Sequence, residues 1–315
     1  MRILVTGANG FVGRHLVADL SQRHDIVAVT RHEARIPGAT ENRVVPSIDS
    51  STDWSGILRD VDVVVHAAAR VHVMKETAAD PLEDFLEVNA RGTQKLAEAC
   101  VAQGVRRLVY LSSIKVNGEL TDGQPFTDFD TPKPVDPYGE SKLRAEEILT
   151  DAADASELEV VILRPTLIYG EGVKGNVAKI LRLVQTGIPI PLGGIRNRRS
   201  MLSIKNLNLW VERAIIEPDT PDHALLISDP SPVSTSSLVT NLSQGMGKKS
   251  RLVPLPSRVA LLVARILGKG AMMQRLIGDL EVTPSYESLP GTRDLLESPS
   301  VALQRLGRTT SEATQ

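Results

Sequence analysis

The first half of the chain alternates short apolar runs with longer amphipathic segments, and this alternation is the strongest constraint on its fold. The apolar runs are Ile3–Val5, Ile26–Val29, Val61–Val65, Leu108–Leu111 and Val160–Leu163. Apolar residues recur at helical spacing in Phe11–Leu20, Glu83–Ala102 and Pro137–Ala153. Strands that are apolar throughout and separated by helices are typical of a parallel sheet covered on both faces. The sequence therefore predicts an α/β fold with a doubly wound parallel sheet, the Rossmann architecture.

The stretch TGANGFVG, between the first predicted strand and the first predicted helix, carries three glycines at a spacing of three. Such a loop lets the backbone approach a pyrophosphate, and the N-terminus of the next helix offers free N–H groups to it. A turn with accidental glycines is the alternative, but strand, loop, helix and next strand all occur in order. We therefore predict a dinucleotide cofactor here. The predicted contacts are Gly7, Asn9, Gly10, Phe11, Val12 and Gly13.

The end of the second predicted strand selects between the two nicotinamide cofactors. An acidic residue there would bind the adenosine ribose hydroxyls of NAD. This chain reads IVAVTRHEAR, with Arg31 at the strand end and no carboxylate. A guanidinium suits a ribose phosphate, so the sequence favours NADP(H) and leaves NAD(H) open. The alternative is that Arg31 is a solvated loop residue.

A second group of polar residues has the pattern of an acid–base site. The stretch DPYGESK places Tyr138 four residues before Lys142, and the preceding Asp-Pro predicts a helix start. We expect the helix dipole and Lys142 to lower the pKa of Tyr138, which would make the phenol a usable base. Ser112 and Ser113 end a predicted strand and could hydrogen-bond the same substrate oxygen. The alternatives are a surface Tyr–Lys pair and serines that cap a turn.

Composition narrows the class of protein. A net charge of −2 and 3% aromatic residues argue against a protein that binds nucleic acid. The one cysteine, Cys100, allows no intrachain disulfide, and we expect it to be a buried thiol. We predict no metal site and, because the chain starts directly in a strand, a cytoplasmic location. The longest apolar run, Val259–Gly268, is too short to span a bilayer. A packed amphipathic helix is expected there, with a membrane-surface helix as the alternative.

The regular alternation stops near residue 165, and shorter segments divided by proline and glycine follow. We expect residues 1–165 to form the dinucleotide-binding domain. Residues 166–315 are expected to form mainly a smaller second lobe, with part of 200–230 returning to the first domain. The tail after Gly291 is polar and weakly periodic, and we expect it to fray.

At this point the motifs resemble those of a known family, the extended short-chain dehydrogenase/reductases that act on nucleotide-diphosphate sugars. TGANGFVG is similar to the family's TGxxGxxG loop, DVVVHAAA to its fourth-strand motif, and LEVNARGT to its N-x-x-G-T segment. The resemblance implies that Ser113, rather than Ser112, acts with Tyr138 and Lys142 as the catalytic set. The cofactor contacts that it implies are Asp49, Ala67, Ala68, Asn89, Tyr138, Lys142 and Pro165.

The resemblance extends to the second lobe, which it implies is the substrate domain for a UDP-sugar. RPTLIYGEGVKGN resembles the segment that crosses to the sugar-nucleotide site, which implies substrate contacts at Asn176 and Val177 beside that of Ser113. IPLGGIRNRRSMLSIKNL resembles the strand with a diphosphate-binding arginine. Arg199 matches best, and Arg196 and Arg198 are near alternatives.

Within the family, the motifs look most like a bacterial subgroup that contains 4-epimerases and 4-keto reductases. Because the strand-end acid of a tightly NAD-bound epimerase is missing, we favour a 4-keto reductase of UDP-4-keto-6-deoxy-N-acetylhexosamine. Such an enzyme would serve O-antigen (lipopolysaccharide) biosynthesis. The alternatives are a UDP-glucose or UDP-N-acetylglucosamine 4-epimerase and a non-catalytic NADP(H)-sensing regulator. A homodimer paired through Glu83–Ala102 and Pro137–Ala153 is expected, without membrane insertion or nucleic acid.

Overall fold

The computed structural model describes residues 1–71, 80–219, 221–256 and 270–313, with Val259, Leu261, Arg265 and Gly268 between the last two ranges. The expected helix over Val259–Gly268 therefore lies largely outside the described residues. No helix in the described part of the chain is long and apolar enough to cross a membrane.

The first lobe is built on a seven-stranded sheet in which every pairing is parallel, with strand order β3-β2-β1-β4-β5-β6-β9. The predicted doubly wound α/β fold is confirmed. The strands are β1 (Arg2–Thr6), β2 (Asp25–Thr30), β3 (Glu41–Val44), β4 (Val63–His66), β5 (Arg107–Leu111), β6 (Glu159–Pro165) and β9 (Leu225–Ile227). The five predicted apolar runs fall on β1, β2, β4, β5 and β6, which are buried on both faces. Sequence reasoning missed β3, a polar edge strand, and β9, which has only three residues.

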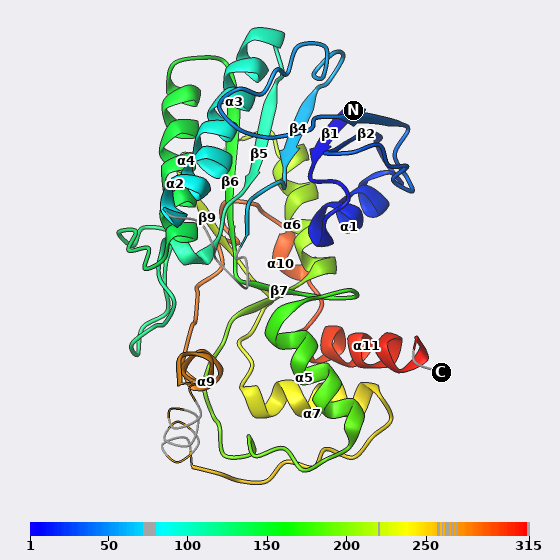
Figure 1. Cartoon of the computed structure of the whole chain (residues 1–315), viewed down its shortest axis with the longest axis vertical. Helices are drawn as coiled ribbons and strands as arrows, with labels where there is room; N and C mark the ends of the chain where they lie inside the picture. Colours follow the sequence, from blue (N-terminus) through cyan, green and yellow to red (C-terminus); the bar gives the residue numbers. More distant parts are fainter. Residues whose placement is uncertain are drawn as a thin grey trace.

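Helices cover both faces of this sheet (Figure 1). One face packs on α1 (Phe11–Leu20) and α6 (Ile204–Ile216), with Trp210 fully buried among them. The other face packs on α3 (Gly92–Gln103) and α4 (Pro137–Asp154). Cys100 is buried in this second layer, as predicted, and burial raises the pKa of its thiol to about 12. Both α6 and β9 belong to the 200–230 stretch, so this part of the chain lies against the first lobe.

The predicted helix over Glu83–Ala102 is not one regular helix. It consists of α2 (Pro81–Leu86), a π-helical turn η1 (Glu87–Arg91) and α3. A π-helical turn adds one residue to the turn and re-aims the side chains within it, and such turns recur at functional sites. Here the turn contains Asn89, which the sequence motif singled out.

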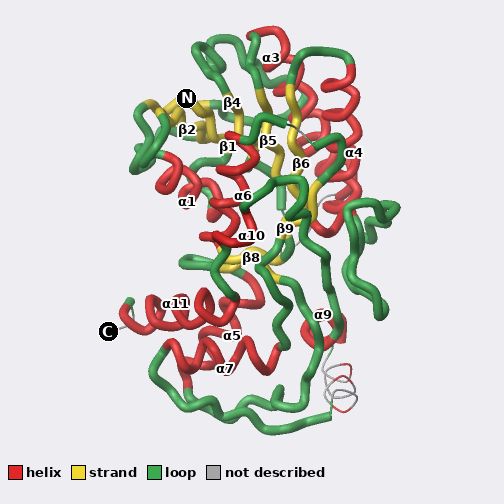
Figure 2. Tube along the Cα trace, turned by 180° about the vertical axis from the view of Figure 1, so that it is seen from behind, coloured by secondary structure: helices red, strands yellow, loops and turns green. Residues whose placement is uncertain are grey.

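The second lobe is smaller and mostly helical, and it occupies the lower half of Figures 1 and 2. Its elements are β7 (Leu167–Tyr169), β8 (Met201–Ser203), α5 (Gly175–Thr186), α7 (Thr235–Gly245), α9 (Gly270–Ile277) and α11 (Pro299–Glu312). The short helix α10 (Thr292–Leu295) lies beside α6 and packs against the first lobe. The strands β7 and β8 form a separate two-stranded parallel sheet. A short turn of helix, η2 (Ile114–Val116), follows β5 in the first lobe.

The expectation that the tail frays is wrong. The tail forms α11, which packs against α7 and buries Ala302, Leu303 and Leu306 in the core of the second lobe. Three apolar residues on one helical face suffice for this packing, although the rest of the helix is polar.

Candidate functional site

The loop between β1 and α1 is a cradle without room for side chains. Gly7 has a φ of +66°, and a Cβ on Gly13 would lie 2.1 Å from the carbonyl oxygen of Gly7. Gly10 is the N-cap of α1, and no side chain caps this helix. The first N–H groups of the helix, those of Phe11 and Val12 among them, therefore stay available to a phosphate. The cradle fits the pyrophosphate of a dinucleotide.

The other predicted cofactor residues outside the helices lie at or beyond the carboxyl ends of parallel strands: Arg31, Asp49, Ala67, Ala68 and Pro165. Ala68 borders the glycine loop, because a Cβ on Gly7 would meet its Cα at 2.9 Å. Arg31 is exposed directly after β2, and Asn9 is exposed at the tip of the loop. Ligands of open parallel sheets bind at this edge. The structure thus brings these positions to one side of the first lobe.

A buried chain of hydrogen bonds runs beneath the glycine loop. The N–H of Ala68 donates to Thr6 Oγ1 at 3.1 Å, and Thr6 Oγ1 lies 2.7 Å from Nδ1 of His66. On the far side, His66 Nε2 lies 3.0 Å from Thr93 Oγ1, which donates to the carbonyl oxygen of Asn89 at 2.7 Å. The Thr93 proton is committed to that carbonyl, so His66 must carry its own proton on Nε2. The chain links the glycine loop to the π-helical turn.

Asn89 is fixed on all sides by hydrogen bonds. Its amide oxygen accepts from the N–H of Arg70 at 2.8 Å, and its amide nitrogen donates to the Arg70 carbonyl at 3.0 Å. The same nitrogen donates to Oγ of Ser141 on α4 at 2.9 Å. Asn89 therefore ties the segment after β4 to α4.

The buried His66 makes folding stability depend on pH. Burial, with a smaller effect of the Lys142 charge, lowers the pKa of His66 from its usual 6.5 to about 3. The unfolded chain therefore binds a proton between pH 6.5 and 3 that the folded chain does not, and stability falls as the pH falls through this window. We expect His66 alone to lower the free energy of unfolding by about 2 kcal/mol between pH 7 and pH 5.

Urea unfolding of the parent protein and of His66→Gln at both pH values measures this contribution. The His66→Gln variant should lose the pH dependence by that amount, whereas His32→Gln, at an exposed position, should keep it. An equal pH dependence in the parent and the His66→Gln variant would refute the assignment.

Ser113, Tyr138 and Lys142 meet where β5 ends and α4 begins. Ser113 follows β5 and caps the turn η2. Asp136 caps α4 by accepting a hydrogen bond from the N–H of Gly139 at 2.8 Å, which places Tyr138 in the first turn as predicted. The ammonium of Lys142, one turn later, lies 6.0 Å from the centroid of the Tyr138 ring. All three predicted catalytic residues are thus neighbours.

Lys142 is 1% exposed. Its Nζ donates to the carbonyl oxygen of Leu111 at 2.8 Å and lies 4.5 Å from the ring centroid of Tyr110. Tyr110 is fully buried in β5 and stacks on His66 with ring centroids 5.6 Å apart. These contacts fix the Lys142 side chain at the carboxyl end of β5.

Burial dominates the acidity of this pair. It raises the pKa of Tyr138 to about 12, against a lowering effect of the hydrogen bond from Ser113. It lowers the pKa of Lys142 to about 7, against a raising effect of Glu146. The expected lowering of the Tyr138 pKa is therefore wrong for the protein alone, because loss of hydration and, to a smaller extent, the Asp136 carboxylate disfavour the phenolate. In the protein alone, burial therefore disfavours the charged form of both residues.

A buried ion pair that sequence reasoning missed lies behind the lysine. Glu146 accepts hydrogen bonds from Arg164 Nη2 at 2.6 Å and Nε at 3.0 Å, and from the hydroxyl of Ser112. Arg164 also donates to the side-chain oxygen of Asn117 at 3.1 Å. Glu146 lies four residues after Lys142, on the buried face of α4. A carboxylate at this position could have indicated from the sequence that a buried partner is needed. The pair holds the end of β5 and keeps a negative charge near Lys142.

A cavity of about 430 Å³ is lined by residues of both lobes. Ser113 and Tyr138 line it from the first lobe, and Asn176, Val177 and Arg199 line it from the second. Residues predicted separately for catalysis and for substrate binding therefore share one cavity. This joint placement is the central feature of the site.

The structure distinguishes among the three neighbouring arginines. Arg199 lines the cavity, its Nη1 donates to the carbonyl oxygen of Gly278 at 3.1 Å, and burial lowers its pKa. Arg198 is exposed and pairs with Glu281 at 2.6 Å, and Arg196 is exposed. Of the three positions, Arg199 is the one that offers a guanidinium to a ligand in the cavity.

Five polar residues that sequence reasoning left out also line this cavity: Lys115, Glu119, Thr166, Thr235 and Arg275. Glu119 accepts from Lys115 Nζ at 2.9 Å and from Arg275 Nη2 at 2.9 Å, so it joins the end of β5 to α9 along the wall. The buried hydroxyl of Thr166 has no hydrogen-bond partner among the described residues. Thr166 directly follows β6 at the carboxyl edge of the sheet, and this position could have indicated from the sequence that it contacts a ligand.

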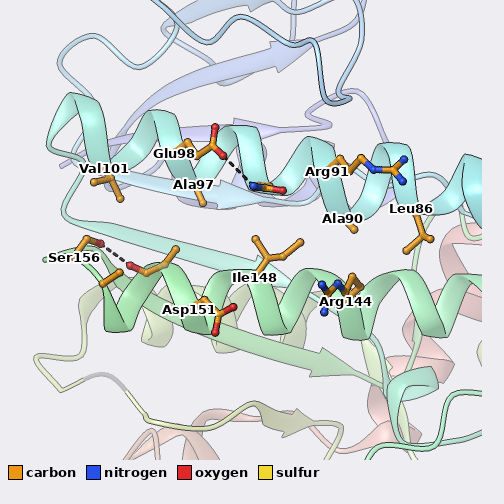
Figure 3. Close-up of a pocket in the computed structure, with 13 residues that line it drawn as sticks. Leu86, Ala90, Arg91, Ala97, Glu98, Val101, Arg144, Ile148, Asp151 and Ser156 are labelled. Carbon is orange, nitrogen blue, oxygen red and sulfur yellow. Dashed lines mark hydrogen bonds between the residues drawn. The ribbon is translucent and has the colours of Figure 1, made fainter.

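A groove of about 790 Å³ lies between α3 and α4 on the outside of the first lobe (Figure 3). Leu86, Ala90, Val101 and Ile148 give it an apolar floor, and Arg144 stands beside them. None of the residues predicted for catalysis, cofactor or substrate lines it. The groove is therefore separate from the cavity between the lobes.

Comparison with known proteins shows which family this chain belongs to. A UDP-glucose 4-epimerase of Vibrio cholerae is 41% identical over 288 residues, which cover 90% of this chain and 88% of that protein. An N-acetyl-alpha-D-glucosaminyl-diphospho-ditrans,octacis-undecaprenol 4-epimerase of Escherichia coli O157:H7 is 26% identical over 82% of this chain and 77% of its own. Among solved structures, the UDP-N-acetylglucosamine 4-epimerase of Bacillus cereus superposes with a TM-score of 0.78 at 21% identity, with 99% of both chains covered.

MoeE5 in complex with UDP-glucose and NAD superposes with a TM-score of 0.74 at 24% identity over the full length of both chains. Residues 3–223 match the model of the NAD dependent epimerase/dehydratase family. These matches confirm the resemblance to the extended short-chain dehydrogenase/reductases of nucleotide sugars and the prediction of an NAD(P)-dependent enzyme. With more than half of its length matched, the chain belongs to the NAD dependent epimerase/dehydratase family.

Proposed function

We propose that the protein is a 4-epimerase of a UDP-sugar. The observation that carries this proposal is the shared cavity, with Ser113 and Tyr138 on one wall and Asn176 and Arg199 on the other. A hydroxyl acid–base pair facing an arginine fits a sugar diphosphate whose ring lies at Tyr138 and whose phosphates lie at Arg199. The 41% identity with a UDP-glucose 4-epimerase over nearly the whole chain supports the same reaction.

Each side chain has a role in this reaction. When bound, the nicotinamide cofactor supplies the hydride acceptor and donor for carbon 4 of the sugar. Tyr138 takes the proton of the carbon 4 hydroxyl. After the 4-keto sugar has turned and carbon 4 is reduced on its other face, Tyr138 returns the proton to the same oxygen. Ser113 hydrogen-bonds the same oxygen and stabilises the charge that develops on it. The protonated Lys142 favours the phenolate of Tyr138.

The 4-keto reductase that the sequence favoured is the second candidate. It is supported by Arg31, which is exposed at the carboxyl end of β2, where it suits the ribose phosphate of NADP(H). A net reductase must exchange its cofactor with a reduced pool, whereas an epimerase reuses one bound molecule. The close relative and the NAD-bound MoeE5 support the epimerase, so we place it first.

One experiment separates the two reactions. The purified protein is incubated with UDP-glucose and with UDP-N-acetylglucosamine, and the 4-epimers are quantified by NMR. In parallel, loss of reduced-nicotinamide absorbance is followed with UDP-4-keto-6-deoxy-N-acetylglucosamine and NADPH or NADH. Interconversion of 4-epimers without net cofactor consumption supports the epimerase. Stoichiometric cofactor consumption with the keto-sugar, and no epimer formation, would replace it with the reductase.

The cofactor preference is tested by Arg31→Asp. We propose that Arg31 binds the ribose phosphate of NADP, so the change should shift the ratio of dissociation constants toward NAD by about tenfold or more. Fluorescence titration with both cofactors measures the ratio. Arg35→Asp, an exposed arginine in the same loop, is the matched control and should leave the ratio unchanged. An unchanged ratio in Arg31→Asp would remove the basis for an NADP preference.

The groove between α3 and α4 supports the predicted homodimer. Its apolar floor runs along both helices that the sequence assigned to subunit pairing (Figure 3). Two copies related by a two-fold axis would place each groove against the same helices of the other copy. The dimer stays a proposal, independent of the reaction.

A further inference from the structure

Two segments of the second lobe carry basic residues and no acidic ones, although Glu171 and Asp229 lie next to them and further acidic residues follow after residue 270. Within residues 172–199 and 230–256 the sequence has nine lysines and arginines and neither aspartate nor glutamate. The whole chain has 36 basic and 38 acidic residues, so the remainder has a clear excess of acid. These two segments are thus locally positive within a chain of net charge −2.

Two stretches of extended chain lie side by side at the end of the second lobe that is farthest from the seven-stranded sheet (Figures 1 and 2). Their backbones are hydrogen-bonded. The N–H of Ile190 donates to the carbonyl of Arg251 at 2.8 Å, and the N–H of Val253 donates to the carbonyl of Ile190 at 2.9 Å. The edge is therefore a fixed surface of the lobe.

The side chains on this edge combine positive charge with exposed apolar groups. We call Ile188, Lys248, Lys249, Arg251 and Val253 the basic edge. The three basic residues are exposed, and Ile188 and Val253 are 51% and 46% exposed. None of the five lines the cavity between the lobes.

We propose that the basic edge docks onto the surface of an anionic lipid bilayer. Basic side chains are attracted to anionic headgroups, and each contributes about fivefold to binding near the surface. Exposed aliphatic side chains between them can enter the headgroup region, as they do in interfacial segments. A nucleic acid fits less well, because the edge has no aromatic side chain on which a base could stack.

Vesicle co-sedimentation of the full-length protein, without substrate, tests the proposal. The vesicles consist of phosphatidylcholine alone or with about one third phosphatidylglycerol. We expect binding to the anionic vesicles, no binding to the neutral ones, and loss of binding in about 0.5 M NaCl because salt screens the attraction. The double variant Lys249→Glu/Arg251→Glu should bind the anionic vesicles at least about 25-fold more weakly.

The matched control is Arg59→Glu/Lys133→Glu, which changes the net charge equally at exposed positions on the first lobe. It should bind the anionic vesicles like the parent protein. Equal weakening in both double variants, or no binding of the parent protein to anionic vesicles, would overturn the proposal. So would tighter binding of a single-stranded RNA than of vesicles, with the same dependence on Lys249 and Arg251. Because no step measures turnover, the outcome is independent of the proposed reaction.

Discussion

Tyr138→Phe is expected to lower the turnover number about a thousandfold while leaving the affinity for the cofactor nearly unchanged. The change removes one hydroxyl group, which in the proposed reaction carries the proton of the carbon 4 oxygen. The fold is expected to be preserved, since the helix start depends on Asp136 and not on the phenol. Steady-state kinetics with the preferred UDP-sugar and cofactor titration by fluorescence measure the two effects.

Tyr110→Phe is the matched control for this prediction. Tyr110 is also a buried tyrosine next to Lys142, but it lies in β5 and does not line the cavity. It should keep most of the activity. Turnover that is undiminished in Tyr138→Phe, or lost equally in both variants, would contradict the assigned acid–base role.

Arg199→Ala is expected to raise the KM for the UDP-sugar about 50-fold, with a smaller effect on kcat. A guanidinium that hydrogen-bonds a diphosphate contributes to binding of the substrate and the transition state alike. The backbone of Arg199 pairs with Val233 at 2.9 and 3.0 Å, and the substitution leaves these bonds in place. Initial-rate kinetics over a range of UDP-sugar concentrations provide the measurement.

Two variants complete this test. Arg196→Ala removes an exposed arginine from the same segment and should leave KM unchanged. Arg199→Lys keeps the charge but loses the fork geometry, so its KM should lie between those of the parent protein and Arg199→Ala. If Arg196→Ala raised KM as much as Arg199→Ala, the diphosphate would not be bound as proposed.

The sequence predicted the sheet well because its central strands are buried on both faces. Such strands are mostly apolar, and β1, β2, β4, β5 and β6 each contain a run of buried apolar residues, with polar residues such as Thr6, His66 and Arg164 near their ends. The edge strand β3 has the sequence ENRV, which carries no such pattern, and the three residues of β9 are too few to show one. Only their pairing in the folded sheet, β3 with β2 and β9 with β6, identifies them as strands.

The candidate site was predicted in its components but not in its electrostatics. The spacing of Tyr138 and Lys142 determined that they share a helix face, because i and i+4 always do in a helix. The acidity of the pair depends on burial, which a sequence does not show. Burial reversed the expected direction of the Tyr138 shift and placed the pKa of Lys142 at about 7.

The sequence by itself determined the parallel α/β fold, the glycine loop and the helix that carries Tyr138 and Lys142, because each follows from the spacing of residues close together in the chain. The resemblance ranked Arg199 first among three neighbouring arginines, and the tertiary structure shows that Arg199, and neither Arg196 nor Arg198, lines the cavity. It also revealed the Glu146–Arg164 pair behind Lys142 and the basic edge of the second lobe. These features join segments that are distant in the chain, and only the packing of the folded molecule fixes which side chains then meet.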